Sequence, residues 1–504
     1  MRKRAARVWA WALALALCLA LLCPLSALGA EAQVEVGAEA YVVMDAATGQ
    51  VVAEKNAHMV NYPASITKIM TLALVLENVD LAKDSGTLVT VSDTAVDALI
   101  PRASQVALVK GEQVPLLDLL YATMIESAND ASHALAEFVA GSMEDFAVLM
   151  NDKAAALGLS GSRFVNPSGQ PDDSHVTTAY DMAAITRWAL GVPGFRQFFS
   201  AVEYTMAPTG LQPAGRQFNS ANLLLMPFTR YHCDGVTGSK TGYTDNALYT
   251  MVTTARRGDT ELICVVLKCG TNNLKYDDTN ALLDYAFGNF RRVSYAAADL
   301  ALGTLPVYGG GTEALGELPL QGTADASFLL HNSLGPEAVQ VTLDAPDRYV
   351  MGESFAPVAV LGLPEQWSAQ SGTLATMPLV LAGLDELLAT STGGARPAGQ
   401  QGEPVSPWVW LAIGIPLLLV CAFAGRVLYV RHRRQKRRMA RLAAARAYKP
   451  VRLADRPKPP QRTPEKGKRV YTPAAAARQQ QPGLRVASRQ VYTIQPRRAG
   501  ERAR

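Results

Sequence analysis

Apolar and β-branched residues form short runs at both ends of the first 290 residues. Residues 40–44 and 50–54 flank a Gly-containing turn, which predicts two paired strands. Residues 248–255 and 261–268 are rich in β-branched residues and predict two more strands. The sheet of this region is therefore expected to combine segments that lie far apart in the sequence.

Between these strands the apolar residues recur at helical spacing. This spacing predicts helices over residues 66–77, 116–126 and 131–157, and the pattern after the last strand predicts a closing helix over 282–290. A strand pair, a group of helices and then further strands are typical of an α+β domain with an antiparallel sheet. We place this domain at residues 34–292.

The pattern changes after this domain. Residues 293–385 contain short apolar runs separated by Gly, Pro and Asp, which predict a small all-β domain. Residues 386–406 are rich in Gly, Ala and Pro and predict a linker.

Two longer apolar segments are typical of sequences directed to a membrane. Residues 1–30 have a basic start, an apolar run and small residues at the end, which predicts a signal peptide cleaved after Ala30 or Ala32. An uncleaved signal anchor is the alternative. Residues 407–430 are apolar over a length that can cross a bilayer, with Trp and Tyr near the ends, and predict one transmembrane helix.

The distribution of charge indicates the orientation of this helix. Residues 431–504 contain 23 Lys and Arg against 3 Asp and Glu, a net charge of +20, whereas residues 31–426 contain 21 against 41, a net charge of −20. The positive-inside rule then places the basic tail in the cytoplasm and the first two domains outside the cell membrane. A basic tail suits the anionic inner leaflet, and its Pro, Ala and Gln content predicts disorder. No nucleic acid is needed to explain its charge.

Composition restricts the class of protein and the kinds of site that the chain can form. With 49% hydrophobic and 18% charged residues, the chain is not a disordered protein as a whole. Cys233, Cys264 and Cys269 are the cysteines between the two apolar segments; they lack metal-site spacing and are expected to be free thiols. None of the 6 His residues forms a zinc motif, so we expect no metal and no cofactor.

The first candidate motif is Pro63-Ala-Ser65-Ile-Thr-Lys68, at the start of a predicted helix. A spacing of three residues brings Ser65 and Lys68 onto one helical face. A serine hydroxyl needs a base to act as a nucleophile, and a desolvated lysine with a lowered pKa can serve. The alternative is a serine near the N-terminus of a helix with an exposed lysine.

Two further motifs follow in order. Ser127-Ala128-Asn129 offers a hydroxyl that can relay a proton and an amide that can hold a substrate carbonyl, although Ser220-Ala-Asn222 repeats the pattern. Lys240-Thr241-Gly242 precedes a predicted strand. It offers a cation and a hydroxyl for a carboxylate, and a Gly that allows a substrate backbone to approach.

The order Ser-x-x-Lys, Ser-x-Asn, Lys-Thr-Gly is a signature of penicillin-binding proteins and class A β-lactamases. Residues 34–385 resemble low-molecular-mass penicillin-binding proteins of the serine D-alanyl-D-alanine carboxypeptidase family (S11). The resemblance extends to the surrounding sequence: Tyr62-Pro-Ala-Ser-Ile-Thr-Lys-Ile-Met70, Ser127-Ala-Asn-Asp-Ala131, Phe164-Val-Asn-Pro-Ser-Gly169, His175-Val-Thr-Thr-Ala-Tyr-Asp-Met-Ala183 and Gly238-Ser-Lys-Thr-Gly-Tyr-Thr-Asp245. It implies a β-lactamase/DD-peptidase-like fold with a helical subdomain.

The resemblance also implies a reaction. Ser65, activated by Lys68, attacks the penultimate D-Ala of a peptidoglycan stem peptide, and Ser127 relays a proton to the departing D-Ala. The backbone N–H groups of Ser65 and Tyr243 stabilise the oxyanion. The remaining substrate-binding residues are Asn129, Lys240, Thr241 and Gly242. β-Lactam antibiotics, which resemble D-Ala-D-Ala, are expected to acylate Ser65.

The chain departs from the family pattern in places. Phe218-Asn219 is followed by Ser220, and Lys275 stands where some relatives would place an Arg for the substrate carboxylate. His175 is expected to be a hydrogen-bonded structural residue and Tyr62 a packing residue. A DD-endopeptidase, a β-lactamase and a catalytically silent wall-binding protein remain alternative functions.

Overall fold

The computed structural model describes residues 34–300, 302–309, 311–364, 373–392 and 491–492 of the 504-residue chain. The contacts divide the chain into two units, Met1–Leu384 with Ser488–Arg504, and Asp385–Ala487. The described part of the second unit consists of residues 385–392. The predicted signal peptide, transmembrane helix and most of the linker and tail therefore lie outside the described residues.

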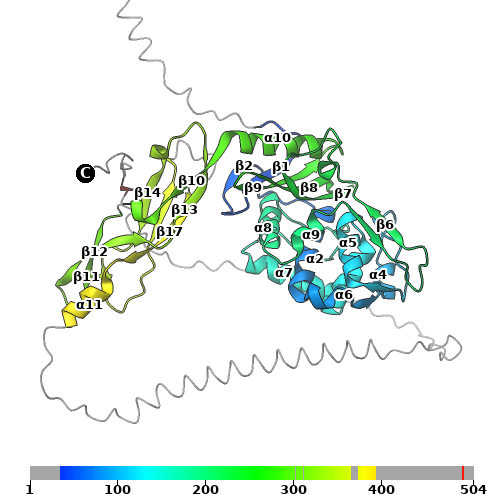
Figure 1. Ribbon diagram of the computed structural model, residues 1–504, viewed down its shortest axis with the longest axis horizontal. Coiled ribbons are helices and arrows are strands. Elements are labelled where there is room, and N and C mark those ends of the chain that lie inside the picture. Colours follow the sequence, from blue (N-terminus) through cyan, green and yellow to red (C-terminus); the bar gives the residue numbers. More distant parts are fainter. Residues whose placement is uncertain (1–33, 301, 310, 365–372, 393–490, 493–504) are drawn as a thin grey trace, which may run out of the picture. The chain divides into compact units, whose positions relative to one another are not determined.

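A five-stranded antiparallel sheet forms the centre of the first domain, in the order β2-β1-β9-β8-β7 (Figure 1). The α+β prediction with an antiparallel sheet is confirmed. The N-terminal strand pair lies beside the strands from residues 236–269, so the two ends of the domain meet in one sheet. The strands are β1 (Ala40–Asp45), β2 (Val51–Lys55), β7 (Val236–Thr244), β8 (Leu248–Arg257) and β9 (Thr260–Cys269).

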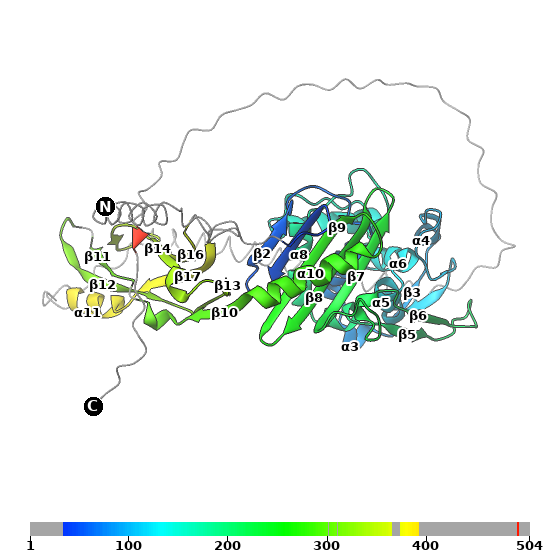
Figure 2. The ribbon, with the colours of Figure 1, turned by 90° about the horizontal axis from the view of Figure 1, so that it is seen from above.

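Each face of this sheet packs against helices. On β9, Val265 belongs to a core shared with helices α2 (Lys68–Asn78) and α8 (Ala179–Leu190), whereas its neighbour Val266 belongs to a second core with α10 (Leu274–Asn289). In Figure 1, α10 lies above the sheet and α8 below it, and Figure 2 shows α10 in front of the strands. Burial on both faces explains why β9 is a continuous apolar run rather than an alternating one.

Most predicted helices are present, with two differences. The helix predicted over residues 131–157 is two helices, because Gly141 adopts a left-handed conformation with φ of 94° and Ser142 accepts a hydrogen bond from the Asp145 N–H at 3.0 Å. Helix α10 begins at Leu274, earlier than predicted.

The remaining elements of this domain are short helices and two hairpins. They are η1 (Ala64–Thr67), α3 (Leu81–Asp84), β3 (Leu88–Thr90), α4 (Asp93–Asp97), β4 (Gln113–Pro115), α5 (Leu116–Ile125), α6 (Asn129–Ala140), α7 (Met143–Ala156), α9 (Phe195–Phe199), β5 (Glu203–Met206), β6 (Arg216–Asn219) and η2 (Leu223–Leu225).

The second domain is rich in β-structure, as predicted. It contains a pair, β10-β13, and a sheet in the order β15-β11-β12-β17-β16-β14-β18. The expected boundary after residue 292 falls inside β10, and α11 occupies the start of the predicted linker. The elements are β10 (Phe290–Tyr295), η3 (Ala297–Asp299), β11 (Thr304–Tyr308), β12 (Ala314–Gly322), β13 (Ala326–His331), η4 (Pro336–Ala338), β14 (Gln340–Asp344), β15 (Tyr349–Val350), β16 (Val358–Gly362), β17 (Thr373–Leu381), α11 (Leu384–Thr392) and β18 (Val491–Tyr492).

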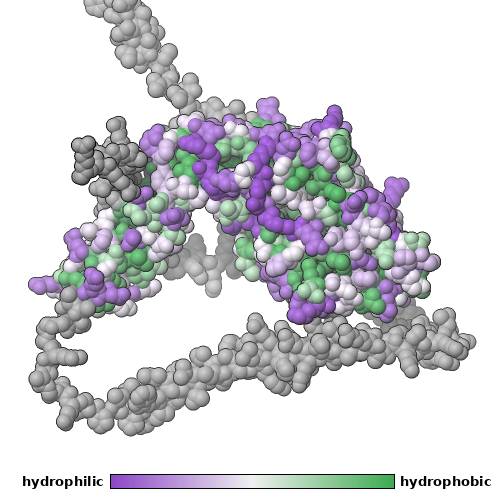
Figure 3. All heavy atoms as spheres, viewed as in Figure 1, coloured by the Kyte–Doolittle hydropathy of each residue, from purple (hydrophilic) through white to green (hydrophobic). Residues whose placement is uncertain are grey.

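Apolar and polar side chains are interspersed on the face shown in Figure 3. Within the described ranges, no helix has the length and apolar character needed to cross a bilayer, and no cluster of His, Cys, Asp and Glu is arranged to hold a metal ion. Cys233, Cys264 and Cys269 are free and buried.

Candidate active site

The three sequence motifs converge on one cleft of about 720 Å³. Ser65 comes from η1, Ser127 from the junction of α5 and α6, and Lys240 from the edge strand β7. Lys68 lies behind Ser65 and is fully buried. The other predicted residues that line the cleft are Asn129, Thr241, Gly242 and Tyr243. The structure therefore brings together every residue that the sequence predicted for the site.

Ser65 and Lys68 have the geometry of a nucleophile and its base. One short helical turn places the Lys68 Nζ 3.0 Å from the Ser65 Oγ. The preceding residue, Ala64, has a φ of 51°, a conformation that costs energy for a residue with a Cβ. The chain thus turns sharply just before the nucleophile.

The surroundings of Lys68 favour its neutral form. Burial, and then the positive charge of Lys240, lower the pKa of Lys68 well below its usual value, while Asp130 opposes the shift. Besides the Ser65 hydroxyl, the amine contacts the Asn129 Oδ1 at 2.7 Å and the Ser168 carbonyl oxygen at 2.6 Å. A neutral amine has two hydrogens, and both oxygens can only accept. The lone pair is then directed at the Ser65 hydroxyl.

Asn129 contacts Lys68 and also lines the cleft. Its Oδ1 accepts a hydrogen bond from the Lys68 amine. Its NH₂ group remains to donate to a substrate carbonyl, which is the role predicted from the sequence. Asn129 thus contributes to the orientation of the base.

A second lysine and a second serine form another pair. The Lys240 Nζ donates to the Ser127 Oγ at 2.9 Å and to the Thr241 carbonyl oxygen at 2.9 Å. Burial, followed by the charge of Lys275, lowers the pKa of Lys240 to about 7. Ser127 itself has a φ of 55°, so its backbone is held in an unfavourable conformation that presents the hydroxyl to the cleft.

Gly242 allows β7 to pass close to the nucleophile. A Cβ at this position would lie 2.9 Å from the Ser65 backbone nitrogen and 2.5 Å from the Thr250 Oγ1. Thr250 in turn donates to the Pro63 carbonyl oxygen at 2.9 Å and so holds the segment before Ser65 against the sheet. Any larger residue at 242 would separate the strand from the nucleophile.

The turn at residues 166–170 contributes to the site, although the sequence indicated it only as family context. The Asn166 Oδ1 accepts the backbone N–H groups of Ser168 at 3.2 Å, Gly169 at 2.8 Å and Gln170 at 3.1 Å. Gly169 has a φ of 80°, and a Cβ there would lie 1.9 Å from the Ala64 carbonyl oxygen. This turn supplies the Ser168 carbonyl that contacts Lys68.

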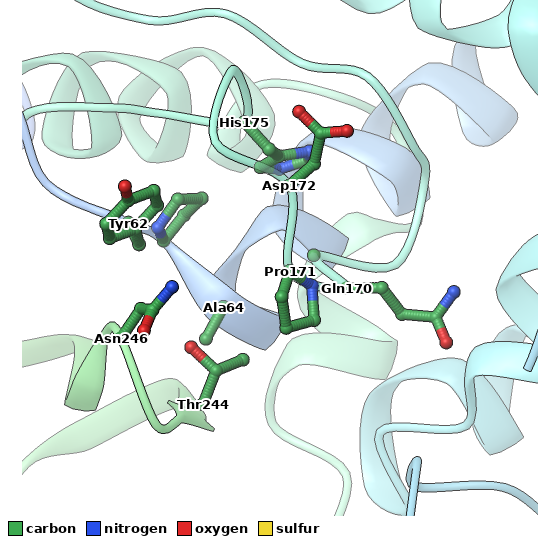
Figure 4. A pocket seen from close by; sticks show the side chains of 10 residues that line it. Tyr62, Ala64, Gln170, Pro171, Asp172, His175, Thr244 and Asn246 are labelled. Carbon is green, nitrogen blue, oxygen red and sulfur yellow. The ribbon is translucent and has the colours of Figure 1, made fainter. Parts of the chain in front are cut away.

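His175 makes the hydrogen bonds expected of a structural residue. The His175 Nδ1 accepts the Val165 N–H at 3.2 Å and its Nε2 lies 2.9 Å from the Thr67 Oγ1, while burial lowers the pKa of the ring to about 4. Tyr62 lines a small hollow beside Ala64 (Figure 4). The hollow measures about 10 Å³, which is about the space of one water molecule.

Lys275 on α10 also lines the cleft. Its ammonium lies over the rings of Tyr249 and Tyr276, donates to the Asn272 Oδ1 and is almost fully buried. Burial lowers the pKa of Lys275 to about 8. Among the described residues, no carboxylate lies within 4.0 Å of the ammonium of Lys275 or Lys240. Two buried cations without a counter-ion make this part of the cleft suitable for an anion.

The sequence matches a family model described as D-alanyl-D-alanine carboxypeptidase over residues 27–271. The chain is 36% identical to the D-alanyl-D-alanine carboxypeptidase DacC of Escherichia coli over 293 residues, covering 56% of this chain and 70% of that protein. It is 34% identical to DacF of Bacillus subtilis, covering 50% of this chain and 63% of that protein. The match with DacF therefore extends over less than two thirds of that relative.

Solved structures share the fold of much of the described chain. Penicillin-binding protein 5 from Haemophilus influenzae matches with a TM-score of 0.57 and 25% identity, covering 69% of this chain and 97% of the other. The D-alanyl-D-alanine carboxypeptidase DacD from Francisella tularensis has the same fold, with a TM-score of 0.55 at 24% identity, covering 69% and 94%.

Proposed function

The chain belongs to the D-alanyl-D-alanine carboxypeptidase family of serine peptidases, and from this premise we propose that Ser65 is its nucleophile. The substrate is a peptidoglycan stem pentapeptide, and the product is the peptide shortened by its terminal D-alanine. The observation that carries the proposal is the buried Lys68 amine 3.0 Å from the Ser65 Oγ, with its other two contacts both acceptors.

The first half-reaction forms an ester on Ser65. Lys68 takes the hydroxyl proton while the Ser65 oxygen attacks the carbonyl carbon of the penultimate D-Ala. The negative oxygen of the tetrahedral intermediate accepts hydrogen bonds from the backbone N–H groups of Ser65 and Tyr243, which the close approach at Gly242 supports. The peptide bond then breaks, and the proton that Lys68 took reaches the amine of the departing D-Ala through the Ser127 hydroxyl, which leaves Lys68 neutral again.

Charge at one end of the cleft selects a free carboxylate. Lys240, the Thr241 hydroxyl and Lys275 surround this end, and the two ammonium groups have no carboxylate partner among the described residues. The terminal carboxylate of the stem peptide supplies the missing negative charge.

Water then hydrolyses the ester in the second half-reaction. A β-lactam acylates Ser65 by the same attack.

The experiment that tests the proposal measures D-alanine release from a diacyl-Lys-D-Ala-D-Ala tripeptide by the full-length protein in detergent, beside Ser65→Ala. Release by the parent and not by Ser65→Ala is the expected result. Stable penicillin labelling without release would favour a cross-link endopeptidase, and rapid loss of the label a β-lactamase. The absence of both release and labelling would favour a catalytically silent protein.

We also infer a location for this activity from the sequence. Residues 1–30 direct export, residues 407–430 span the cell membrane once, and the catalytic domain lies outside. The tail of residues 431–504 then lies in the cytoplasm, where its net charge of +20 attracts it to anionic lipids of the inner leaflet. This topology excludes the pairing of β18 with β14 in the membrane-bound protein.

A further inference from the structure

A buried histidine that the mechanism above does not use lies behind the Ser168 carbonyl. His133 is in the second turn of α6, four residues after Asn129, and is fully buried. Its Nδ1 lies 2.9 Å from the Ala95 carbonyl oxygen, and its Nε2 lies 3.2 Å from the Ser168 Oγ. The ring therefore connects helix α4, which contains Ala95, to the turn that contacts Lys68.

The partners of the ring determine where its hydrogen lies. A carbonyl oxygen can only accept, so the Nδ1 of His133 must carry the hydrogen. Burial lowers the pKa of His133 to about 4, so the ring is neutral at physiological pH and Nε2 is an acceptor. The Ser168 hydroxyl then donates to Nε2. The other acceptor nearby, the Asn166 Oδ1 at 3.3 Å, already receives three backbone N–H groups.

This hydrogen bond holds Ser168 beside the base. The Ser168 carbonyl oxygen is the acceptor 2.6 Å from the Lys68 Nζ, and the second acceptor, the Asn129 Oδ1, comes from the same helix as His133. Both oxygens that orient the amine are thus fixed by α6, one directly and the other through the imidazole. Displacement of either oxygen would turn the lone pair of Lys68 away from Ser65.

We propose that His133 is a positioning residue for the catalytic base: its ring fixes the Ser168 carbonyl, which orients Lys68 toward Ser65. This inference rests on the proposed role of Lys68 as the base. A role in packing alone would be served by an apolar side chain, but that replacement would leave the Ala95 carbonyl oxygen and the Ser168 hydroxyl without their partner in the core.

Two amide substitutions separate the two hydrogen bonds of the ring. In His133→Asn the side-chain NH₂ can replace Nδ1 and donate to the Ala95 carbonyl oxygen. No group of this shorter side chain then accepts the hydrogen bond from the Ser168 hydroxyl. In His133→Gln the amide oxygen can replace Nε2 and accept from the Ser168 hydroxyl. The proposal predicts that Gln preserves catalysis better than Asn, whatever their relative stabilities.

The measurement is the second-order rate constant for acylation by benzylpenicillin as a function of pH, with the full-length protein. We expect His133→Asn to lower the maximal rate by about tenfold, and His133→Gln to retain most of it. Loss of the Ser168 carbonyl as an acceptor destabilises the ammonium form of Lys68 more than the neutral amine, because hydrogen bonds from charged donors are stronger. The pKa of Lys68, and the acidic limb of the profile, should therefore move to lower pH in His133→Asn.

Ser168→Ala supplies a second test from the other side of the same contact. It should reproduce the effect of His133→Asn, and the double variant should be no slower than either single one. Thr186→Ala is the matched control, because it removes a buried hydroxyl that donates to the Met182 carbonyl oxygen in α8.

Equal rates in His133→Asn and His133→Gln, or rates that fall only in proportion to lost thermal stability as in Thr186→Ala, would overturn the proposal. Failure of the parent protein to be acylated would instead contradict the proposed function. The two failures are therefore distinguishable.

Discussion

Position 275 holds a lysine, which can lose its charge, where an arginine is expected in some relatives. The pKa of Lys275 is lowered to about 8 by burial, so it loses its charge at moderately alkaline pH. An arginine in its place would stay charged throughout this range. The affinity of the cleft for a terminal carboxylate should therefore depend on pH in a way that a single substitution can remove.

We predict that Lys275→Met raises KM for the tripeptide about tenfold or more, because a charged partner of the carboxylate is lost. Lys275→Arg should keep KM low and flatten its rise above pH 8. Lys240, whose pKa is about 7, should cause a separate change in KM at lower pH, both in the parent protein and in Lys275→Arg. The measurement is kcat and KM from pH 6 to 9.5, with Lys83→Met on exposed α3 as the control. An unchanged KM in Lys275→Met would exclude the contact.

The residues predicted for the site came from motifs in which reacting groups lie within a few residues of each other. Ser65 and Lys68 are one helical turn apart, and their contact follows from that spacing. Ser168 and His133 were not predicted, because their contacts join residues 100 and 35 positions apart in the sequence. A backbone carbonyl also leaves no mark on residue identity, so no motif search could assign it to Lys68.

At the scale of elements, one carboxylate joins four segments of the catalytic domain. Glu261 on β9 pairs with both terminal guanidinium nitrogens of Arg196 on α9, at 2.7 and 2.9 Å, and with Arg256 on β8 at 2.7 Å. It also accepts a hydrogen bond from the Thr237 Oγ1 on β7 at 2.9 Å. Burial opposes ionisation, but these donors outweigh it and lower the pKa of Glu261 to about 2. The cluster lies outside the cleft.

We predict that Glu261→Gln lowers the free energy of unfolding at neutral pH by about 1–2 kcal/mol, since both arginines are partly exposed to solvent. The pKa of Glu261 is lower in the folded protein than in the unfolded chain, where it is near 4.5, so ionised Glu261 stabilises the folded protein above that pH. This contribution is lost as the pH falls toward 2. Thermal unfolding of both proteins should therefore differ at pH 7 and converge in acid. A constant difference across this range would contradict the assignment, and kcat should be unchanged.

Long periodic segments were predicted better than short ones. The strands β8 and β9 have ten residues each and the apolar pattern identified both. The hairpins β3-β4 and β5-β6 have strands of three or four residues, too short to show a period. The break between α6 and α7 depends on Gly141 and the Ser142 cap, a local signal that apolar spacing across residues 131–157 conceals.

For the whole molecule, the distribution of charge in the sequence predicts a membrane topology. The charges of residues 31–426 and 431–504 are opposite, −20 and +20, and an apolar segment of 407–430 lies at the change of sign. A hydrolase whose substrate is the peptidoglycan needs its cleft outside the membrane. The charge rule and the proposed substrate therefore favour the same topology.

The last prediction tests this topology with fusions to the full-length chain. A fluorescent protein that folds only in the cytoplasm should fluoresce when attached after Arg504, whereas penicillin applied to intact cells should still label Ser65. Removing residues 407–504 should release a protein that penicillin still labels, because the described catalytic domain and its cleft end well before residue 407. Replacing the Lys and Arg of residues 431–438 with Gln should reduce the fluorescent fraction, since the positive charges beside the apolar segment retain that end in the cytoplasm. Fluorescence absent from the parent fusion, or a truncated protein that stays in the membrane fraction, would contradict a single span at 407–430.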